Sequence, residues 1–417
     1  MMDLFTNPDL FIVINTYTDL RSLCDTCTLL STLKKYIFNL FNKTYSLMYH
    51  DDISFRNRVL NKIFNPNKQL HLQLSNSGYR ITDVSALGNV HTLDLGDCEI
   101  KDVSMLGNVH TLILGSCKKI TDVSALGNVH TLNLMYCDKI TDVSALGNVH
   151  TLYLMYCDKI TDVSALGNVH TLNLCSCENI TDVSALGKVH TLDLKYCKSI
   201  TDVSALGNVH TLDLMYCDEI TDVSMLGNVY DLILGSCKKI TDVSALGNVH
   251  TLNLDKCYEI TDVSMLGNVY ELSLCHCEIT DVSALGNVHT LNLCGCRHIS
   301  DVSALGNVHT LDLGGCEIID VSALGNVHTL NLMYCKKITD VSALGNVYEL
   351  NLTGCKITDV SALGNVHTLN LRCCDKITDV SMLGNVHTLD IRNCKNITDV
   401  SFSAIVRNVH TLKTAWW

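Results

Sequence analysis

Two residue types that bind metals or take part in redox chemistry return at a fixed interval through most of the chain. Seventeen aspartates stand 19 or 20 residues apart from Asp83 to Asp399. Sixteen cysteines follow the same interval from Cys98 to Cys394. Thiolate and carboxylate groups are common protein ligands of zinc and calcium. If the chain makes one coil per interval, each residue type forms a row, so these rows are the first candidates for chemistry.

The cysteine row has a structural interpretation. Each of these cysteines stands where a small buried residue with a weakly donating S–H group would pack against the neighbouring copy. The chain starts MMDLFTNPDL, with no basic segment ahead of an apolar run, so we expect no secretion signal and reduced thiols. We therefore predict packing rather than disulfides or a metal centre.

The aspartate row predicts caps of short helical turns. Calcium needs several oxygens around one ion, whereas each copy offers one carboxylate followed by Val-Ser-Ala, as after Asp142. An aspartate before a helical turn accepts hydrogen bonds from backbone N–H groups. We expect the Ser and Ala two and three residues on to donate them.

A third row consists of fourteen histidines between His91 and His410, and in three further copies Tyr230, Tyr270 and Tyr348 take the same place. Tyrosine in place of histidine argues against metal ligands and indicates rings stacked along the margin of a sheet. A row of imidazoles would protonate together near pH ~6, so we also expect acid to loosen the array.

One irregular cluster stands apart from these rows. Asp255, Cys275 and Cys294 occupy the same position in successive copies, and His276 lies beside them. Chance placement is the interpretation that we favour over zinc, because nothing in the pattern enforces tetrahedral geometry. We predict no metal site and no cofactor. The repeat also lacks a nucleophile with its base, a Gly-rich phosphate loop and an H-E-x-x-H motif, so we expect no enzyme.

The copies themselves predict the element that positions these rows. In the copy 129–148, Val129, Leu132 and Leu134 have L-x-x-L-x-L spacing, Cys137 follows, and Gly147-Asn148 turns the chain toward the next copy. The pattern resembles leucine-rich repeats, with an ITDVSAL return like that of bacterial internalins and a cysteine like that of F-box repeat proteins. The resemblance implies an α/β solenoid, a horseshoe or arc with one parallel β-sheet. Twenty residues leave little room for an α-helix, so we expect 3₁₀ or irregular turns on the convex side. The solenoid would span residues 67–417 in about 17 repeats, with a C-terminal cap over 400–417 that the tryptophans Trp416 and Trp417 close.

The first 66 residues do not repeat, and their apolar spacing predicts three or four short helices between Pro8 and Pro66. The segment from about Leu4 to Tyr49 has an Asn-Pro-Asp start, an apolar run, Asp-Leu-Arg-Ser-Leu, and Cys-x-Leu-Leu-x-x-Leu running into Lys-Lys-Tyr-Ile. This order of residues resembles an F-box. Where this chain has Asn7-Pro8, that family usually has Leu-Pro. An F-box docks on the Skp-type adaptor of a cullin ubiquitin ligase. The resemblance implies adaptor contacts by Pro8, Leu10, Ile14, Leu20, Leu23 and Leu30. The alternative is a helical cap over the first core layer.

The copies differ from one another mainly at the outward strand position and at the two residues before the row cysteine. In leucine-rich repeats these positions face the concave surface, and tyrosine and methionine are typical of interfaces. We favour a protein partner on this surface over drift among duplicated copies. The predicted binding residues are Met135, Tyr136, Tyr153, Met155, Tyr156, Lys195, Tyr196, Met215, Tyr216, Met333 and Tyr334.

The charge balance bears on the kind of partner. The net charge is −13, and residues 1–68 carry eight positive and six negative groups, which leaves −15 on the repeats. Nucleic-acid binding needs clustered Lys and Arg, so we expect a protein partner instead. We expect no membrane span, a cytoplasmic location and a monomer outside a complex. The preferred function is an F-box-type substrate receptor, and the alternative is a binding scaffold without a ubiquitin role. The composition resembles repeat proteins of large DNA viruses of amoebae, whose proteins would act in the host cytoplasm.

Overall fold

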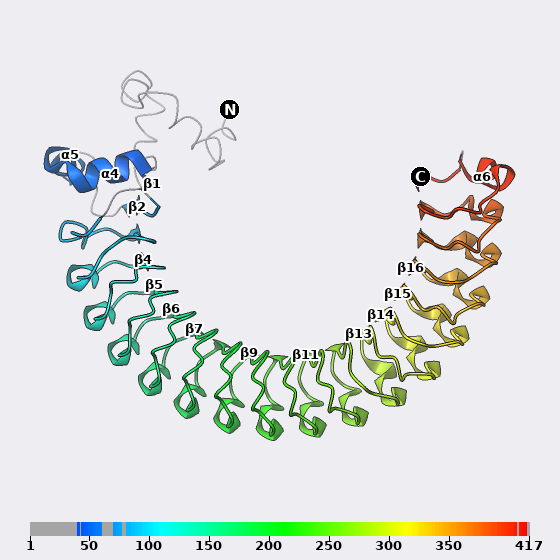
Figure 1. Cartoon of the computed structure of the whole chain (residues 1–417), viewed down its shortest axis with the longest axis horizontal. Helices are drawn as coiled ribbons and strands as arrows, with labels where there is room; N and C mark the ends of the chain where they lie inside the picture. Colours follow the sequence, from blue (N-terminus) through cyan, green and yellow to red (C-terminus); the bar gives the residue numbers. More distant parts are fainter. Residues whose placement is uncertain (1–39, 42, 61–69, 77–80, 407, 415–417) are drawn as a thin grey trace, which may run out of the picture. The chain divides into compact units, whose positions relative to one another are not determined.

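The computed structural model describes residues 40–41, 43–60, 70–76, 81–406 and 408–414 (Figure 1). The chain divides into two compact units, Met1–Ile180 and Thr181–Trp417. Each unit is a stack of parallel strands joined by tight returns, and each is described by itself. The predicted solenoid with one parallel sheet and 3₁₀ turns is confirmed in both.

Among its described residues, the first unit contains two short α-helices and seven strands. The α-helices are α4 (Lys43–Asp51) and α5 (Ile53–Arg58). The strands are β1 (Leu40–Phe41), β2 (His71–Gln73), β3 (Thr92–Asp94), β4 (Thr111–Ile113), β5 (Thr131–Asn133), β6 (Thr151–Tyr153) and β7 (Thr171–Asn173). The 3₁₀ helices are η2 (Ser104–Leu106), η3 (Ser124–Leu126), η4 (Ser144–Leu146) and η5 (Ser164–Leu166).

The second unit contains twelve strands and one α-helix among its described residues, α6 (Asp399–Ile405). Its strands are β8 (Thr191–Asp193), β9 (Thr211–Asp213), β10 (Asp231–Ile233), β11 (Thr251–Asn253), β12 (Glu271–Ser273), β13 (Thr290–Asn292), β14 (Thr310–Asp312), β15 (Thr329–Asn331), β16 (Glu349–Asn351), β17 (Thr368–Asn370), β18 (Thr388–Asp390) and β19 (Thr411–Lys413). Its 3₁₀ helices are η6 (Ser184–Leu186), η7 (Ser204–Leu206), η8 (Ser224–Leu226), η9 (Ser244–Leu246), η10 (Ser264–Leu266), η11 (Ser283–Asn287), η12 (Ser303–Asn307), η13 (Ser322–Asn326), η14 (Ser342–Asn346), η15 (Ser361–Asn365) and η16 (Ser381–Leu383).

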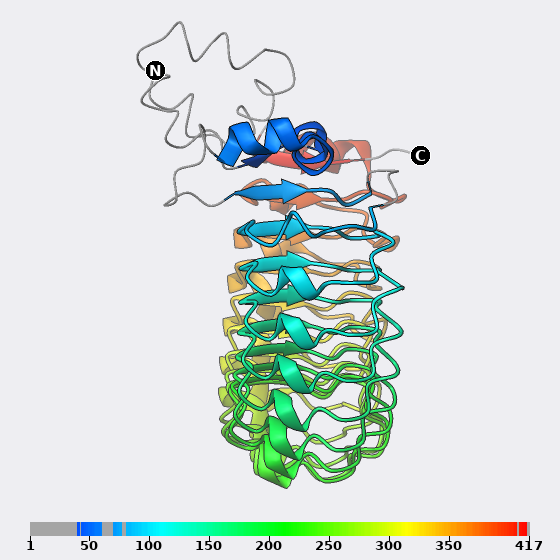
Figure 2. The same cartoon turned by 90° about the vertical axis from the view of Figure 1, so that its left-hand side faces the viewer.

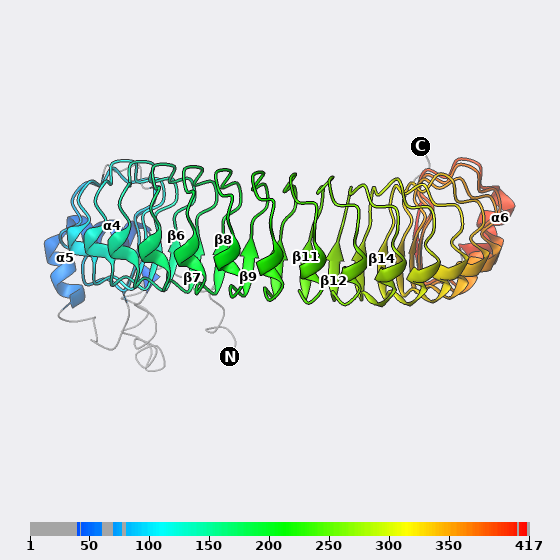
Figure 3. The same ribbon diagram turned by 90° about the horizontal axis from the view of Figure 1, so that it is seen from below.

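The strands pair in strict register from copy to copy. Leu132 of β5 lies beside Leu152 of β6, and Leu212 of β9 lies beside Leu232 of β10. In each unit the strands occupy the inner, concave side of the coil and the 3₁₀ helices follow one another along the outer side (Figures 1 and 3). This arrangement turns every repeated residue into a row along its unit, as the period predicts.

Each copy contributes a complete layer of core. In the copy around β9, the buried side chains are at most 2% exposed and comprise Val209, Leu212, Leu214, Cys217, Ile220, Val223 and Leu226. Gly227 then turns the chain toward the next strand with an ordinary φ of −63°. A Cβ atom on Gly227 would lie only 2.3 Å from the carbonyl oxygen of Ala245 in the next copy. Glycine is needed there because the neighbouring backbone is too close, not because of its backbone angles.

The helices α4 and α5 lie across the first strands of their unit (Figure 2). The N–H of Gln73 in β2 donates to Ser46 Oγ of α4 at 3.0 Å. His50 Nε2 donates to the carbonyl of Asp83 at 2.8 Å, and Tyr49 is 2% exposed. The predicted helical character is therefore confirmed for residues 43–58. The predicted adaptor-binding residues and most of the F-box-like match lie outside the described residues.

At the other end of the chain, α6 replaces the 3₁₀ turn of the earlier copies, and β19 completes the sheet of the second unit. The hydroxyl of Ser401 in α6 accepts a hydrogen bond from the N–H of Val380 at 2.5 Å. The predicted tryptophan lid, Trp416 and Trp417, lies outside the described residues. In the part of the chain that the structure describes, no helix has the length and apolar character needed to cross a membrane.

Candidate binding face

The aspartates of the row accept hydrogen bonds from the backbone of the turns that follow them. In sixteen copies the aspartate Oδ1 accepts a hydrogen bond of 2.8–2.9 Å from the serine N–H two residues on. These bonds hold the pKa of carboxyl groups such as Asp142 and Asp222 below the usual range. The predicted hydrogen bond from the serine N–H is confirmed, but the prediction that the aspartate is the N-cap was wrong. The 3₁₀ helix begins at the serine, so a valine such as Val143 is its N-cap, without a side-chain bond.

The cysteine row is packing, as predicted. In fourteen copies from Cys117 to Cys394 the thiol donates to the carbonyl of a leucine in the preceding copy, at 2.9–3.3 Å. Burial raises the pKa of the Cys117 thiol to about 12 and that of Cys335 to about 11. The thiols of the row are therefore buried groups that bond to the neighbouring backbone, which is a packing role.

The histidine row is a stack of rings within each unit, and the predicted stacking is confirmed. From His91 onward neighbouring ring centroids lie 4.4–4.9 Å apart, and Tyr230, Tyr270 and Tyr348 join the stack in the second unit. Desolvation, together with the neighbouring imidazoles, lowers the pKa of His150. The row is a structural margin of the sheet.

The last residue of most strands also serves the backbone, which sequence reasoning missed. In twelve copies an Asn or Asp at this place accepts a hydrogen bond of 2.7–3.1 Å from the N–H two residues on, as Asn133 does from Met135. This is the side-chain turn that Asn and Asp favour. Their recurrence at one offset was the signal that could have identified it. These side chains therefore have a structural role in the turn.

The residue before each row cysteine has left-handed backbone. Positive φ values near 60° occur at Tyr136, Tyr156, Tyr196, Tyr216 and Tyr334, where three other copies have glycine. Bulky side chains rarely adopt this conformation. The turn aims these rings away from the core. Tyr136, Tyr156 and Tyr334 are 41%, 38% and 51% exposed.

The structure brings the predicted binding residues together in three places. The first tyrosine patch, in the first unit, consists of Met135, Tyr136, Tyr153, Met155 and Tyr156. The rings of Tyr136 and Tyr156 stack with centroids 4.5 Å apart and planes 8° apart. All five residues follow or end the adjacent strands β5 and β6. The patch is therefore one continuous surface.

The second tyrosine patch lies in the second unit and consists of Lys195, Tyr196, Met215 and Tyr216. Its two rings also stack, with centroids 4.5 Å apart, and Lys195 Nζ lies 5.5 Å from the centroid of Tyr196. Burial raises the pKa of Asp213 beside it. Met333 and Tyr334 stand six strands further on in this unit, so they belong to neither patch.

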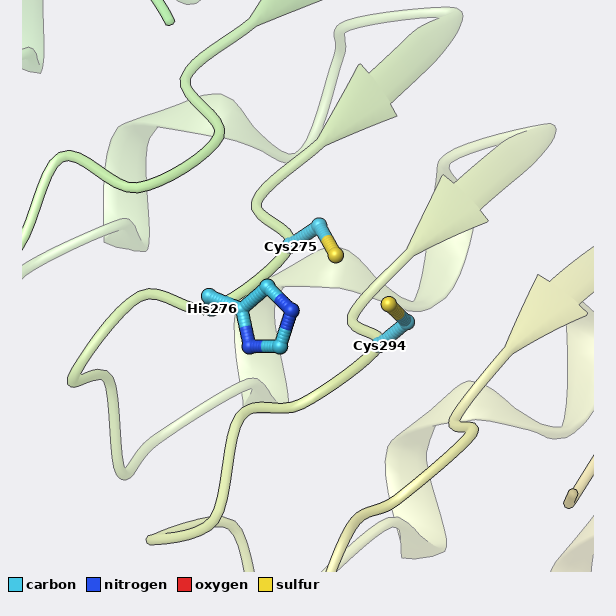
Figure 4. Close-up of side chains that lie close together, drawn as sticks. All are labelled: Cys275, His276 and Cys294. Carbon is cyan, nitrogen blue, oxygen red and sulfur yellow. The ribbon is translucent and has the colours of Figure 1, made fainter. Parts of the chain in front are cut away.

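Cys275, His276 and Cys294 form a separate group (Figure 4). One potential ligand atom from each lies within 4.8 Å of the other two. Burial and the neighbouring thiol of Cys294 raise the pKa of Cys275. The structure thus brings together three of the four residues that the sequence placed near one another. Asp255 is not part of the group.

Three known structures are similar to large parts of the chain. A TLR13–ssRNA13 complex matches with a TM-score of 0.52 and 19% identity, over 80% of this chain and 59% of that one. A leucine-rich repeat protein of Leptospira interrogans matches with a TM-score of 0.48 and 17% identity, over 87% and 98%. An internalin (inlF) of Listeria monocytogenes matches with a TM-score of 0.46 and 21% identity, over 76% and 82%.

Sequence comparisons add no family assignment. No protein-family model matches the chain, and no curated protein does. The fold is assigned from the structure itself, which has in-register parallel strands, 3₁₀ returns and one buried layer per copy. The chain has the leucine-rich repeat fold.

Proposed function

We propose that the chain is a non-enzymatic scaffold that binds a protein partner through its two tyrosine patches. The observation that carries this proposal is the placement of tyrosine on left-handed backbone. Tyr136, Tyr156, Tyr196 and Tyr216 have φ values of 59–63°. A left-handed residue with a Cβ atom costs roughly 1–2 kcal/mol relative to its usual conformation.

Glycine fits this position at a lower conformational free energy than tyrosine. Gly295, Gly315 and Gly354 occupy it in other copies, and glycine takes positive φ without a penalty. Stacking of two aromatic rings stabilises the protein by only about 0.5–1.5 kcal/mol per pair. The backbone also accepts Ser, Lys and His at this position, so it does not itself require the paired tyrosines. Strained positions of this kind are typical of functional sites, and tyrosine is enriched at the centre of interfaces.

The surface around the patches favours a protein over a nucleic acid. The structural neighbour TLR13 is in a complex with ssRNA13, so this fold does accept RNA. A phosphate backbone needs clustered positive charge, whereas residues 69–417 carry a net charge of −15. Methionine and tyrosine beside a single Lys195 suit a mixed apolar and polar protein surface.

The test compares the immobilised full-length chain with two double variants, Y136N/Y156N and Y196N/Y216N. Asparagine tolerates left-handed backbone, so both variants should fold. The control is Y258N, which removes a tyrosine that is 45% exposed and outside both patches. Proteins retained by the wild type and by Y258N should bind a double variant more than about 10-fold more weakly, as expected for a tyrosine hot spot. Unchanged affinity in both double variants refutes the proposal.

A finer proposal concerns residues 4–49, which we infer to be an F-box that docks on a Skp-type adaptor. The support is the order of apolar and basic residues in that segment. The contact of α4 with β2 through Ser46 supports the competing interpretation, a cap without a ubiquitin role, for residues 43–58. Co-purification of the full chain with the adaptor and cullin, lost in L20D/L23D, would support the F-box. If the wild-type chain captures neither the adaptor nor the cullin, the interpretation of this segment as a cap on a binding scaffold remains.

The proposed location follows from the same chemistry. Twenty described cysteines are free, and those of the row are buried thiols. Free thiols persist in reducing compartments, which supports the cytoplasm. We infer a viral source from the resemblance in composition to repeat proteins of large DNA viruses of amoebae.

A further inference from the structure

We propose that Cys275, His276 and Cys294 bind one zinc ion. The two cysteines occupy the same position in adjacent copies, in the turns that follow β12 and β13, and His276 projects from the first turn toward the second cysteine (Figure 4). Among the residues that the structure describes, no other three His, Cys, Asp or Glu side chains meet the same spacing. This proposal does not depend on the tyrosine patches.

The spacing suits tetrahedral zinc. Zinc lies ~2.3 Å from cysteine sulfur and ~2.0–2.1 Å from histidine nitrogen, so two of its ligands are roughly 3.5–3.8 Å apart. The ligand atoms of Cys275, His276 and Cys294 already lie within 4.8 Å of one another. The difference of about 1 Å is within the reach of side-chain rotation.

The backbones of the three residues are held by hydrogen bonds. The N–H of His276 donates to the carbonyl of Cys294 at 2.7 Å, which ties the two turns together. The N–H of Cys294 donates to Asn292 Oδ1 at 3.0 Å. At Cys275 the usual Asn or Asp is missing, because β12 ends in Ser273. Its N–H donates instead to Asp255 Oδ1 of the preceding copy at 2.8 Å.

Asp255 thus positions Cys275 without being a ligand. Its Oδ1 also accepts a hydrogen bond of 2.5 Å from Ser273 Oγ, and its Oδ2 accepts one of 3.2 Å from Asn253 Nδ2. Both carboxylate oxygens thus have hydrogen-bond partners. The carboxylate adds a negative charge close to the thiols, and such a charge favours a bound cation.

The imidazole of His276 lies over a glycine. A Cβ atom on Gly295 would be 2.2 Å from His276 Nδ1, so a side chain at residue 295 would push the ring away. Gly295 has a φ of +73°, where glycine carries no penalty. The turn therefore leaves room for the ring beside Cys294.

The ligand set indicates the metal. Two thiolates and one imidazole select zinc over magnesium or calcium, which prefer oxygen. Three protein ligands leave the fourth position of a tetrahedral ion open. His276 is exposed and both cysteines are partly exposed, so that position is accessible to solvent. The site resembles a reactive zinc centre in composition more than a closed structural one.

The experiment uses the reduced full-length chain, freed of metal by a chelator and then titrated with Co²⁺ and Zn²⁺. We expect one thiolate-to-cobalt charge-transfer band per chain, which one equivalent of Zn²⁺ abolishes. C275S and C294S should each lose that band and bind Zn²⁺ more than about 100-fold more weakly, beyond the effect typical of groups that only support a ligand. H276Y should weaken binding as well, and it carries the residue found in this place in other copies.

Two controls separate this site from other thiols and imidazoles. C373S removes a partly exposed cysteine outside the group, and H309Y removes one ring of the histidine row. Both should bind Zn²⁺ as the wild type does. Circular dichroism checks that every variant keeps its fold. A wild type without the charge-transfer band, unchanged zinc affinity in C275S and C294S, or a Cys275–Cys294 disulfide under reducing conditions would each overturn the proposal.

Discussion

The close approach of successive copies at the Gly-Asn turn makes a sharp prediction about stability. Gly227 and Gly384 have nearly the same backbone, with φ and ψ of −63° and −11° for the first and −62° and −19° for the second. Alanine adopts both conformations. On backbone entropy alone, either Gly→Ala change would stabilise the protein by about 0.4–1 kcal/mol.

The neighbouring copy changes this expectation for Gly227 only. A Cβ atom on Gly227 would lie 2.3 Å from the carbonyl oxygen of Ala245, whereas one on Gly384 would meet Asn408 Nδ2 at an ordinary 3.4 Å. Real Cβ atoms stay at least 3.0 Å from such an oxygen, so two copies must separate by about 0.7 Å. Overpacking of this kind costs about 1–3 kcal/mol. We therefore expect G227A to destabilise the protein and G384A to be neutral or stabilising.

Hydrogen exchange is the suitable assay, because repeat proteins open in segments. The N–H of Val229 bonds to the carbonyl of Leu226, and that of Val386 bonds to the carbonyl of Leu383. Protection at Val229 should fall by about 5- to 150-fold in G227A, which is the overpacking cost expressed as an equilibrium constant. Protection at Val386 should stay level or rise in G384A. Equal protection of Val229 in G227A and the wild type would refute the reasoning.

Three further predictions concern the rows and turns. Burial and the neighbouring imidazoles lower the pKa of His91 from 6.5 in the folded protein. The neutral histidine stack therefore stabilises the fold fully above pH 6.5 and loses this contribution as the pH falls toward the folded-state pKa. The melting temperature should therefore drop between pH ~7.5 and ~5, and an unchanged value would remove the effect. In a chelating buffer, an alkylating reagent should modify the partly exposed Cys275, Cys294 and Cys373 before the buried cysteines of the row. Peptide mass spectrometry can follow the modification, and equal alkylation rates for exposed and buried cysteines would contradict the burial. N133A should cost about 1 kcal/mol in denaturant unfolding, because the 3.0 Å bond from the Met135 N–H is lost, while N133D keeps it; equal stability of N133A and the wild type would argue against the turn.

The repeat itself was readable because burial recurs with the same spacing in every copy. Leu132, Leu134 and Cys137 predicted one strand and one inward turn, and all three are fully buried. The aspartate, cysteine and histidine rows were likewise assigned structural roles from their period and from the residues around them. The N-cap position of the aspartate was predicted wrongly, because the 3₁₀ helix begins one residue later than the pattern suggested and valine precedes it.

What the sequence by itself determined is the coil, its layers of core and the residue types that each row presents, because these follow from a local pattern repeated many times. Only the tertiary structure decided which outward side chains meet. The stack of Tyr136 on Tyr156 and the approach of His276 to Cys294 both join residues from different copies. Both depend on turns with left-handed backbone. The residue types do not reveal these turns, because Tyr, His and Gly all occupy that position. The physical reason is that register brings equivalent residues together, while backbone handedness and side-chain rotation decide whether they touch.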